Sequence, residues 1–224
     1  MAQIYTDFSD YDNDSDLYTE WEPRGRSTTS SFTLTNDSQA DGGVRLDFTG
    51  QGSSGVALIW KEHGSAEDQE IVAKMRMPVS SNNNVPRNFF RVTNDPFDND
   101  SYWIRQHTGN VILGGYIDGS FTTFGDTSYD LLDDVWYIFR VRAEGNTLSG
   151  KVWQADNPEP SNWLIESVDS SHTSGEFGIG SWNRDTLFNT DFVGVGTDGD
   201  TAPMEPVVSS NSPLAPTNLT ALEL

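Results

Sequence analysis

Apolar and polar residues alternate with a period of two over many short runs of the chain, which is the pattern of half-buried β-strands. Residues 71–77 place Ile, Ala and two Met at alternate positions, and residues 137–142 alternate Tyr, Phe and Val with Ile and Arg. One face of each run is expected to point into a core. Since no window sustains apolar residues at the i, i+3, i+4 and i+7 spacing of a helix, the pattern predicts an all-β protein.

Further runs of the same kind bring the expected number of strands above ten. They occupy residues 32–34, 44–48, 56–60, 88–93, 102–107, 111–117, 148–154, 163–168, 176–182 and 191–196. Clusters of Gly, Asn, Asp and Ser separate the runs and favour tight turns, as at Gly109, Asp118 and Gly145. Short strands at this spacing in one block of about 200 residues indicate a two-sheet sandwich or a barrel.

The composition changes near residue 200, which divides the chain into a folded domain over 1–200 and a tail over 201–224. The tail is rich in Pro, Ser and Asn, so we expect it to be extended and to pack on a partner chain. The triplet Thr-Asp-Phe occurs at 6–8 and again at 190–192, in the first and last expected strands. Terminal strands of a jelly roll often lie side by side, so these two are expected to be neighbours.

The charge balance excludes several classes of protein. Thirteen Lys and Arg against 34 Asp and Glu give a net charge of −21. A protein that binds nucleic acid or a membrane surface needs a basic face, so neither is an expected partner. No run approaches the roughly 18 apolar residues that span a bilayer. The chain has no Cys, which excludes a disulfide framework, a thiolate metal site and a Cys nucleophile.

The acids are mostly Asp, with 23 Asp, 11 Glu and only 3 Lys in the chain. Short, strongly hydrated carboxylates in place of long Lys side chains suit a surface kept soluble in concentrated salt, where self-repulsion is screened. This favours a halophilic origin, and an ordinary acidic secreted or viral protein is the alternative. Because Asp is abundant everywhere, an Asp cluster indicates a metal site less strongly than usual.

Two acidic clusters have the residue types of a calcium site. Residues 10–16 alternate Asp as in the first half of an EF-hand loop, but the rest of that loop is missing. Asp95, Asp98 and Asp100 lie in a loop between two expected strands, and they are the candidate calcium ligands. Surface acidity explains both clusters as an alternative, so calcium is a hypothesis.

Catalytic motifs are scarce. There is no GxSxG, HExxH or Walker sequence, and the three His are isolated from one another. A glycoside hydrolase needs two carboxylates roughly 5 to 9 Å apart. Glu67 and Glu70 come closest to such a pair, but their spacing puts them on opposite faces of a strand. We therefore expect no catalytic residues and no enzymatic activity.

Seven Trp are a stronger indication of function. Sugars stack their C–H faces on aromatic rings, while Asp, Asn and Arg bond the hydroxyl groups. Trp103, Arg105 and His107 alternate with Tyr102 and Ile104, so they share one face of an expected strand. We take Trp103, Arg105 and His107 as the candidate glycan-binding residues. For any single Trp, a place in the core is the alternative.

Three segments of the chain carry a family resemblance. Residues 136–153 read Trp-Tyr-Ile-Phe-Arg-Val-Arg-Ala-Glu-Gly-Asn-Thr-Leu-Ser-Gly-Lys-Val-Trp, residues 174–182 read Ser-Gly-Glu-Phe-Gly-Ile-Gly-Ser-Trp, and the chain opens with Thr-Asp-Phe-Ser-Asp at 6–10. This resembles a concanavalin A-like (laminin-G-like) lectin/glucanase jelly-roll domain over about residues 4–197. The resemblance implies a two-sheet antiparallel sandwich and a leaning toward glycans. It carries over no site, because neither the acidic catalytic strand of the glucanases nor the calcium-and-sugar loop of the legume lectins has a match.

Domains of this type occur in secreted glycosidases, in adhesins, and in tail, fibre or head-decoration proteins of tailed viruses. The first expected strand begins within about five residues of Met1, which leaves no room for a signal peptide. We therefore predict a non-enzymatic structural or host-attachment protein on the exterior of a virion, assembled in the cytoplasm of a halophilic host. The expected partners are other virion proteins, further copies of the chain as a trimer, and a host cell-surface glycan. A glycan-active enzyme or carbohydrate-binding module is the alternative, as is a decoration protein without a ligand.

Overall fold

The computed structural model describes residues 3–25, 31–49, 55–61, 65–77, 86–94, 96–97, 100–182 and 187–206. Within these ranges the chain forms fifteen strands and one short helix. In chain order they are β1 (Gln3–Thr6), α1 (Asp14–Glu20), β2 (Trp21–Gly25), β3 (Phe32–Asn36), β4 (Val44–Thr49), β5 (Gly55–Trp60), β6 (Gln69–Arg76), β7 (Pro86–Val92), β8 (Ser101–His107), β9 (Asn110–Ile117), β10 (Ser120–Ser128), β11 (Trp136–Glu144), β12 (Thr147–Gln154), β13 (Ile165–Val168), β14 (Glu176–Trp182) and β15 (Leu187–Thr197). No helix in this part of the chain has the length and apolar character needed to cross a membrane.

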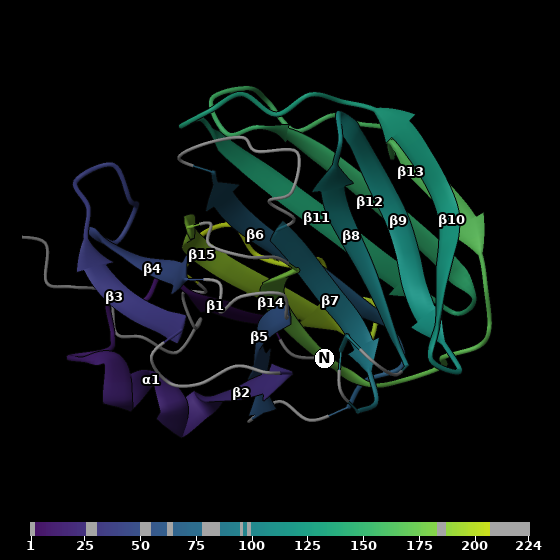
Figure 1. Cartoon of the computed structure of the whole chain (residues 1–224), viewed down its shortest axis with the longest axis horizontal. Coiled ribbons are helices and arrows are strands. Elements are labelled where there is room, and N and C mark those ends of the chain that lie inside the picture. Colours follow the sequence, from purple (N-terminus) through teal and green to yellow (C-terminus); the bar gives the residue numbers. More distant parts are fainter. Residues whose placement is uncertain are drawn as a thin grey trace, which may run out of the picture.

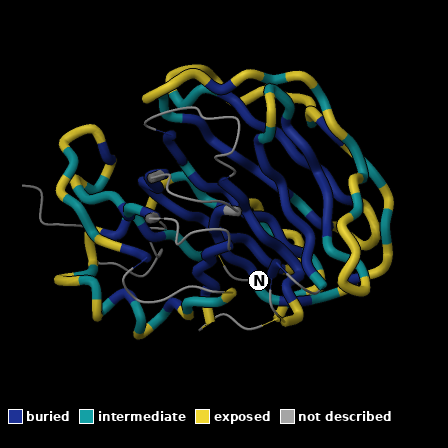
Figure 2. Tube along the Cα trace, viewed as in Figure 1, coloured by how far each residue is buried: buried dark blue, intermediate teal, exposed yellow. Residues whose placement is uncertain are grey.

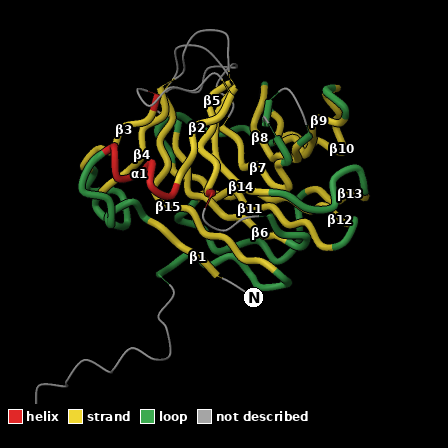
Figure 3. The backbone as a smooth tube through the Cα atoms, turned by 90° about the horizontal axis from the view of Figure 1, so that it is seen from below, coloured by secondary structure: helices red, strands yellow, loops and turns green. Residues whose placement is uncertain are grey.

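The strands form two antiparallel sheets packed face to face (Figure 1). Sheet A has the strand order β13-β12-β11-β6-β15-β4-β3, and β1 also pairs with β15. Sheet B has the order β10-β9-β8-β7-β14-β5-β2. Figure 3 shows the two layers from the side, with β5, β7 and β8 of sheet B above β1 and β6 of sheet A. The predicted all-β, two-sheet antiparallel jelly roll is confirmed.

The period-two pattern determines which residues enter the core between the sheets. On β6, Ile71 and Ala73 point inward, while Val72 lies in a separate cluster on the outer face of sheet A. On β11, Phe139 lies opposite Ala73 and is also buried between the sheets. Figure 2 shows the result, with buried strands and exposed turns. Each large apolar side chain buried in this way stabilises the fold by roughly 1.5–3 kcal/mol.

The first and last strands of the domain are neighbours, as predicted. β1 pairs antiparallel with the second half of β15, and Thr6 lies opposite Val193. The first half of β15 pairs instead with β4, where Phe188 faces Phe48. One long strand thus joins the N-terminal segment to the rest of sheet A.

Two strands were not predicted from the sequence pattern. β2 and β10 are both edge strands of sheet B. β10 is rich in Ser and Thr, and none of its residues is fully buried. Because an edge strand with no buried face has no apolar alternation, the pattern could not reveal it.

The helix α1 was not predicted either, and it explains part of the acidic cluster at 10–16. Asn13 is its N-cap, and the side chain accepts a hydrogen bond from the Ser15 backbone N–H at 2.9 Å. Asp14 and Asp16 lie in the first turn, where a negative charge interacts favourably with the helix dipole. Asp14 also accepts a hydrogen bond from Leu34 N at 2.7 Å. These acids therefore have structural partners.

The first residues of the predicted tail pack on the domain itself. Ala202 is buried against Val72 and Phe192 on the outer face of sheet A. Its backbone N–H donates to Glu70 Oε1 at 3.1 Å, and Gln3 Nε2 donates to the Thr201 carbonyl at 2.8 Å. Residues 207–224 lie outside the described residues, so packing of the tail on a partner chain stays a prediction.

Candidate functional site

The three predicted glycan-binding residues lie on the outer face of sheet B. Trp103 belongs to the apolar cluster on that face, whereas Tyr102 and Ile104 belong to the core between the sheets. Arg105 and His107 follow Trp103 at alternate positions of β8 and so point the same way. The structure therefore brings all three together on one strand face.

Trp103 is fully buried within this face. Its ring lies across Gly114 of β9, where any side chain would collide with it. The guanidinium carbons of Arg87 and Arg105 lie 4.9 and 4.7 Å from the ring centroid, which is cation–π distance. Trp103 is thus covered by two arginine side chains, and its ring is not accessible to a sugar.

The exposed ring of this region is Phe121 on β10, which is 48% exposed. It lies 5.2 Å from Trp103 between ring centroids and 5.9 Å from Tyr116. The Arg105 guanidinium carbon is 4.8 Å from the Phe121 centroid. We call Arg87, Trp103, Arg105, Tyr116 and Phe121 the arginine–aromatic cluster. Sequence reasoning missed Phe121 because β10 carries no apolar alternation.

Arg105 has no acidic partner among the residues that the structure describes. Arg105 is 9% exposed, and its Nε is buried without a hydrogen-bond partner. Burial, together with the positive charge of Arg87, lowers the pKa of Arg105 to about 9. Ion pairs with Asp or Glu are made by Arg24, Arg45, Arg76, Arg91, Arg140 and Arg142.

Arg87 extends the positive potential around Arg105, and His107 lies within reach of both charges. Arg87 lies directly opposite Arg105 on β7, is almost fully buried, and makes a side-chain hydrogen bond with Tyr116. Burial and the charges of both arginines lower the pKa of His107. His107 Nδ1 lies 3.0 Å from Thr108 Oγ1. At neutral pH His107 is therefore a neutral hydrogen-bonding group beside two cations.

The loop with the candidate calcium ligands is anchored on the same face of sheet B. Phe97 from this loop packs edge-on against Phe89, with 5.1 Å between ring centroids. Asp95 and Asp98 lie outside the described residues, and Asp100 accepts a hydrogen bond from Asp118 N at 3.2 Å. Elsewhere in the described chain, no group of three or more His, Asp or Glu is placed to hold a metal ion.

The other end of this face carries a pair of acids around one arginine. Arg24 on β2 donates to Glu22 at 2.8 Å and to Glu176 Oε1 at 3.0 Å. These residues line an open hollow of about 460 Å³, a size within the range of small-ligand sites. Both carboxylates bind the same guanidinium, so neither is free of a partner. The outward positions of β7, β8 and β9 carry no carboxylate.

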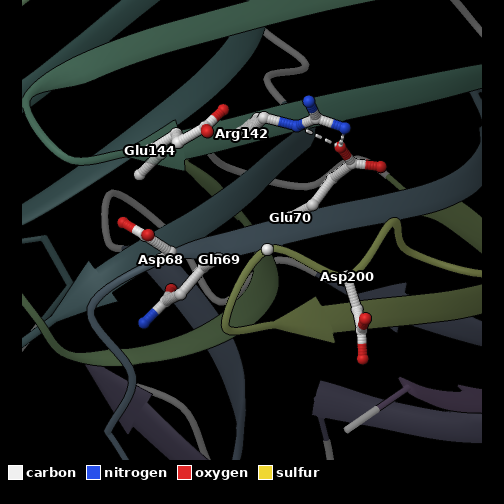
Figure 4. Close-up of a pocket in the computed structure, with 8 residues that line it drawn as sticks. Asp68, Gln69, Glu70, Arg142, Glu144 and Asp200 are labelled. Atoms are coloured by element: carbon white, nitrogen blue, oxygen red, sulfur yellow. Dashed lines mark hydrogen bonds and ion pairs between the residues drawn. The ribbon is translucent and has the colours of Figure 1, made fainter. Parts of the chain in front are cut away.

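A cavity on sheet A contains more acids but is too small for a sugar. It lies between β6, β11 and the turn at Asp200, and its volume is about 80 Å³. Ligand sites usually measure about 300–1,000 Å³. In Figure 4 the Glu70 carboxylate faces Arg142, whereas Asp200 points away from both. Glu67 and Glu70 are not a catalytic pair here, because Glu70 is ion-paired and buried.

A larger hollow of about 470 Å³ lies beside β1 and α1. Tyr5, Tyr11, Asp16 and Glu20 are among its lining residues. The Tyr11 hydroxyl donates to Glu20 at 2.7 Å, and burial together with this bond raises the pKa of Tyr11. The hollow is acidic, unlike the arginine–aromatic cluster.

No family model and no curated protein matches the sequence. Solved structures do share the fold. A GH16 protein of Bacteroides ovatus, from a mixed-linkage-glucan locus and in complex with its product, has a TM-score of 0.62 at 10% identity, over 86% of this chain and 99% of its own. The carbohydrate-binding module CBM66 from Bacillus subtilis has a TM-score of 0.56 at 13% identity, over 77% and 92%.

The exoplasmic/lumenal domain of VIP36, in its Ca²⁺- and Man₃GlcNAc-bound form, has a TM-score of 0.53 at 14% identity. The match covers 88% of this chain and 89% of that domain. At such identities the likeness shows the fold alone. The chain therefore has the two-sheet jelly-roll fold that carbohydrate-binding domains and glycosidases share.

Proposed function

We propose that the protein binds a glycan, without cleaving it, on the outer face of sheet B around Phe121 and Arg105. The observation that carries this proposal is the half-exposed Phe121 ring beside the Arg105 guanidinium, at 4.8 Å. An exposed ring is a surface on which the C–H face of a sugar stacks, and a guanidinium donates hydrogen bonds to sugar oxygens. The glycan-binding relatives of this fold support the proposal.

Trp103 and His107 have supporting roles in this proposal. Trp103 lies under Arg105 and fixes the plane of its guanidinium, while His107 supplies a neutral hydrogen-bonding group at the end of β8. The role of Trp103 therefore differs from the open stacking platform that its place on the strand suggested.

A glycan array tests the proposal directly. Phe121→Ala should weaken binding to the preferred glycan about two- to tenfold, since stacking on an aromatic ring contributes about 0.5–1.5 kcal/mol. Leu132→Ala is the matched control, because Leu132 is also a large exposed apolar residue, at 56%, but lies outside the cluster. Equal loss of binding in both variants would contradict the proposal.

Binding without hydrolysis is supported by the lack of carboxylates at the outward positions of β7, β8 and β9. The competing proposal is a glycan-active enzyme, and the acids in the hollow around Arg24 favour it. Glycoside hydrolysis needs two carboxylates that act on one bond. Reducing-sugar release from the array glycans, abolished in both Glu22→Gln and Glu176→Gln, would support the enzyme and overturn the binding-only proposal.

The proposal includes a calcium ion, which Asp95, Asp98 and Asp100 would bind. The likeness to the Ca²⁺-bound form of the VIP36 exoplasmic/lumenal domain supports this part of the proposal. Calcium should raise the thermal midpoint of the protein, and the rise should disappear in Asp98→Asn. An unchanged midpoint in 5 mM calcium, about a thousandfold above a typical sensor affinity, would exclude a tight site.

The setting in which the protein binds its glycan is a further part of the proposal. We propose the exterior of a virion of a halophile, where copies of the chain, as a trimer, and other virion proteins are the partners. A carbohydrate-binding module of a secreted glycosidase fits the structural relatives equally well. Labelled protein mixed with halophilic cells in molar salt should bind saturably if it attaches to hosts, and retention only on isolated polysaccharide would favour the module.

A further inference from the structure

The cations on the outer face of sheet A have acidic partners, whereas Arg105 on the outer face of sheet B has none in the described chain. On sheet A, Arg140 and Arg142 pair with Glu70, and Lys74 pairs with Asp191 at 2.6 Å. On sheet B, Arg105 has neither an ion pair nor a hydrogen bond from its buried Nε. In a chain with 34 acids and 13 basic residues, carboxylates are abundant enough to supply a partner for every cation. Arg105 has no such partner in the described chain, so its guanidinium can bind an anion that comes from outside the chain.

Two aromatic rings lie next to the guanidinium of Arg105. The ring of Trp103 lies 4.7 Å from it and the ring of Phe121 4.8 Å from it. A guanidinium that stacks on aromatic rings keeps its N–H groups in the plane, free to donate to a carboxylate or sulfate. Arg105 can therefore donate hydrogen bonds to an anionic oxygen group as well as to a hydroxyl group.

The neighbours of Arg105 reinforce the positive potential and do not neutralise it. Arg87 lies directly opposite on β7, and Ile112 lies opposite on β9. The next residue in this row, Asp126 on β10, accepts a hydrogen bond from Asn110 at 3.3 Å. An anion bound at Arg105 would thus meet two guanidinium groups before it met a carboxylate.

We propose that the glycan bound by this face is acidic, and that Arg105 binds the carboxylate or sulfate group of a charged sugar while Phe121 stacks on its ring. The proposal rests on the proposed glycan-binding function and specifies its ligand class. Uronic acids, sialic acids and sulfated sugars share the required chemistry, because each presents anionic oxygens next to an apolar C–H face.

An array of matched glycan pairs tests the ligand class. Each pair differs only in the charged group: a uronate and its methyl ester, a sialylated glycan and its desialylated form, and a sulfated glycan and its desulfated form. Binding is measured in 0.5 M salt, where the Debye length of about 4 Å screens repulsion by the net charge of −21. We expect the acidic member of at least one pair to bind at least tenfold more tightly, and the pair concerned distinguishes carboxylate from sulfate.

Two variants test whether Arg105 is responsible for the preference for the acidic glycan. Arg105→Gln should lower binding of the acidic member about tenfold or more and leave the thermal midpoint at or above that of the wild type. Lys61→Gln removes the same charge from an exposed side chain that donates to the Tyr18 carbonyl, and it should leave binding unchanged. Equal binding of both members of every pair would overturn the acidic specificity but keep the glycan-binding function. Binding to no glycan would overturn both.

Discussion

Glu70 is a buried carboxylate whose partners all lie within the chain. It is 1% exposed, and it pairs with Arg140 and Arg142 and accepts the Ala202 backbone N–H at 3.1 Å. A buried charge costs free energy unless its hydrogen-bonding capacity is filled, and here it is filled. Arg105, in contrast, is a buried charge without an acidic partner in the described chain.

Glu70→Ala should lower the free energy of unfolding by about 3–5 kcal/mol, because Arg140 and Arg142 would lose their shared partner. Urea unfolding measures this loss. Glu144→Ala, on the exposed end of the same strand pair, is the control and should change the free energy by less than about 0.5 kcal/mol. A loss below about 1 kcal/mol for Glu70→Ala would mean that the ion-pair network contributes little.

Arg105→Met should leave the protein as stable as the wild type or more stable by up to about 2 kcal/mol, because an unpaired buried charge is removed. Burial and the charge of Arg87 lower the pKa of Arg105 from its ordinary value to about 9, so the unfolded chain binds this proton more tightly. The penalty in the wild type is therefore full below pH 9 and declines as the pH rises above 9.

The advantage of Arg105→Met should accordingly shrink above pH 9. Thermal unfolding of both proteins at pH 7 and pH 10 tests this. A Met variant that is less stable at pH 7 would show that Arg105 stabilises the fold.

At the scale of the elements, β15 depends on a close approach between two backbone segments. Gly194 lies beneath the Pro203 carbonyl, and a side chain at this position would collide with it. The glycine thus lets residues 201–206 pack on sheet A, where Ala202 reaches Glu70.

Gly194→Ala should displace this segment and destabilise the protein by about 1–3 kcal/mol, the usual cost of overpacking. Limited proteolysis should then cut more readily near residue 202, and thermal unfolding gives the loss of stability. Val193→Ala on the same strand is the control for a core defect, since it should lower stability without a change in cleavage near residue 202. Unchanged proteolysis in Gly194→Ala would contradict the packing.

The elements that the sequence predicts are those with one buried and one exposed or polar face. β6 and β11 alternate clearly, because their inner residues enter the core and their outer residues form ion pairs. β10 and α1 carry no such signal. β10 is an edge strand with no fully buried residue, and α1 has a single buried residue, Leu17, so apolar periodicity is missing in both.

The candidate site was predictable only along its own strand. Residues two apart on β8 share a face, so Trp103, Arg105 and His107 could be grouped from the sequence. Phe121 and Arg87 come to the same place through strand pairing, which the sequence does not specify. The burial of Trp103 likewise depends on Gly114 of the next strand.

At the scale of the whole molecule, the net charge of −21 sets the conditions for stability. Ion pairs with Asp or Glu are formed by Arg24, Arg45, Arg76, Arg91, Arg140 and Arg142, and the acids still far outnumber the basic residues. Repulsion among exposed acids falls as the Debye length shortens from about 10 Å in 0.1 M salt to about 3 Å in 1 M salt.

Raising NaCl from 0.1 to 2 M should therefore raise the thermal midpoint by about 4–8 °C, equivalent to about 2 kcal/mol for a chain of this size. Differential scanning calorimetry at constant pH measures the rise. A control in sucrose separates screening from general solute exclusion. A midpoint that falls with salt would contradict both the screening argument and a halophilic origin.

We propose that the outer face of sheet B binds the glycan. The most direct test of this is an NMR titration of the ¹⁵N-labelled protein with the glycan that binds best on the array. We predict that the largest backbone shifts occur in β8, β9 and β10, centred on Arg105 and Phe121. Shifts confined to the outer face of sheet A, or to the hollow beside β1 and α1, would contradict the claim.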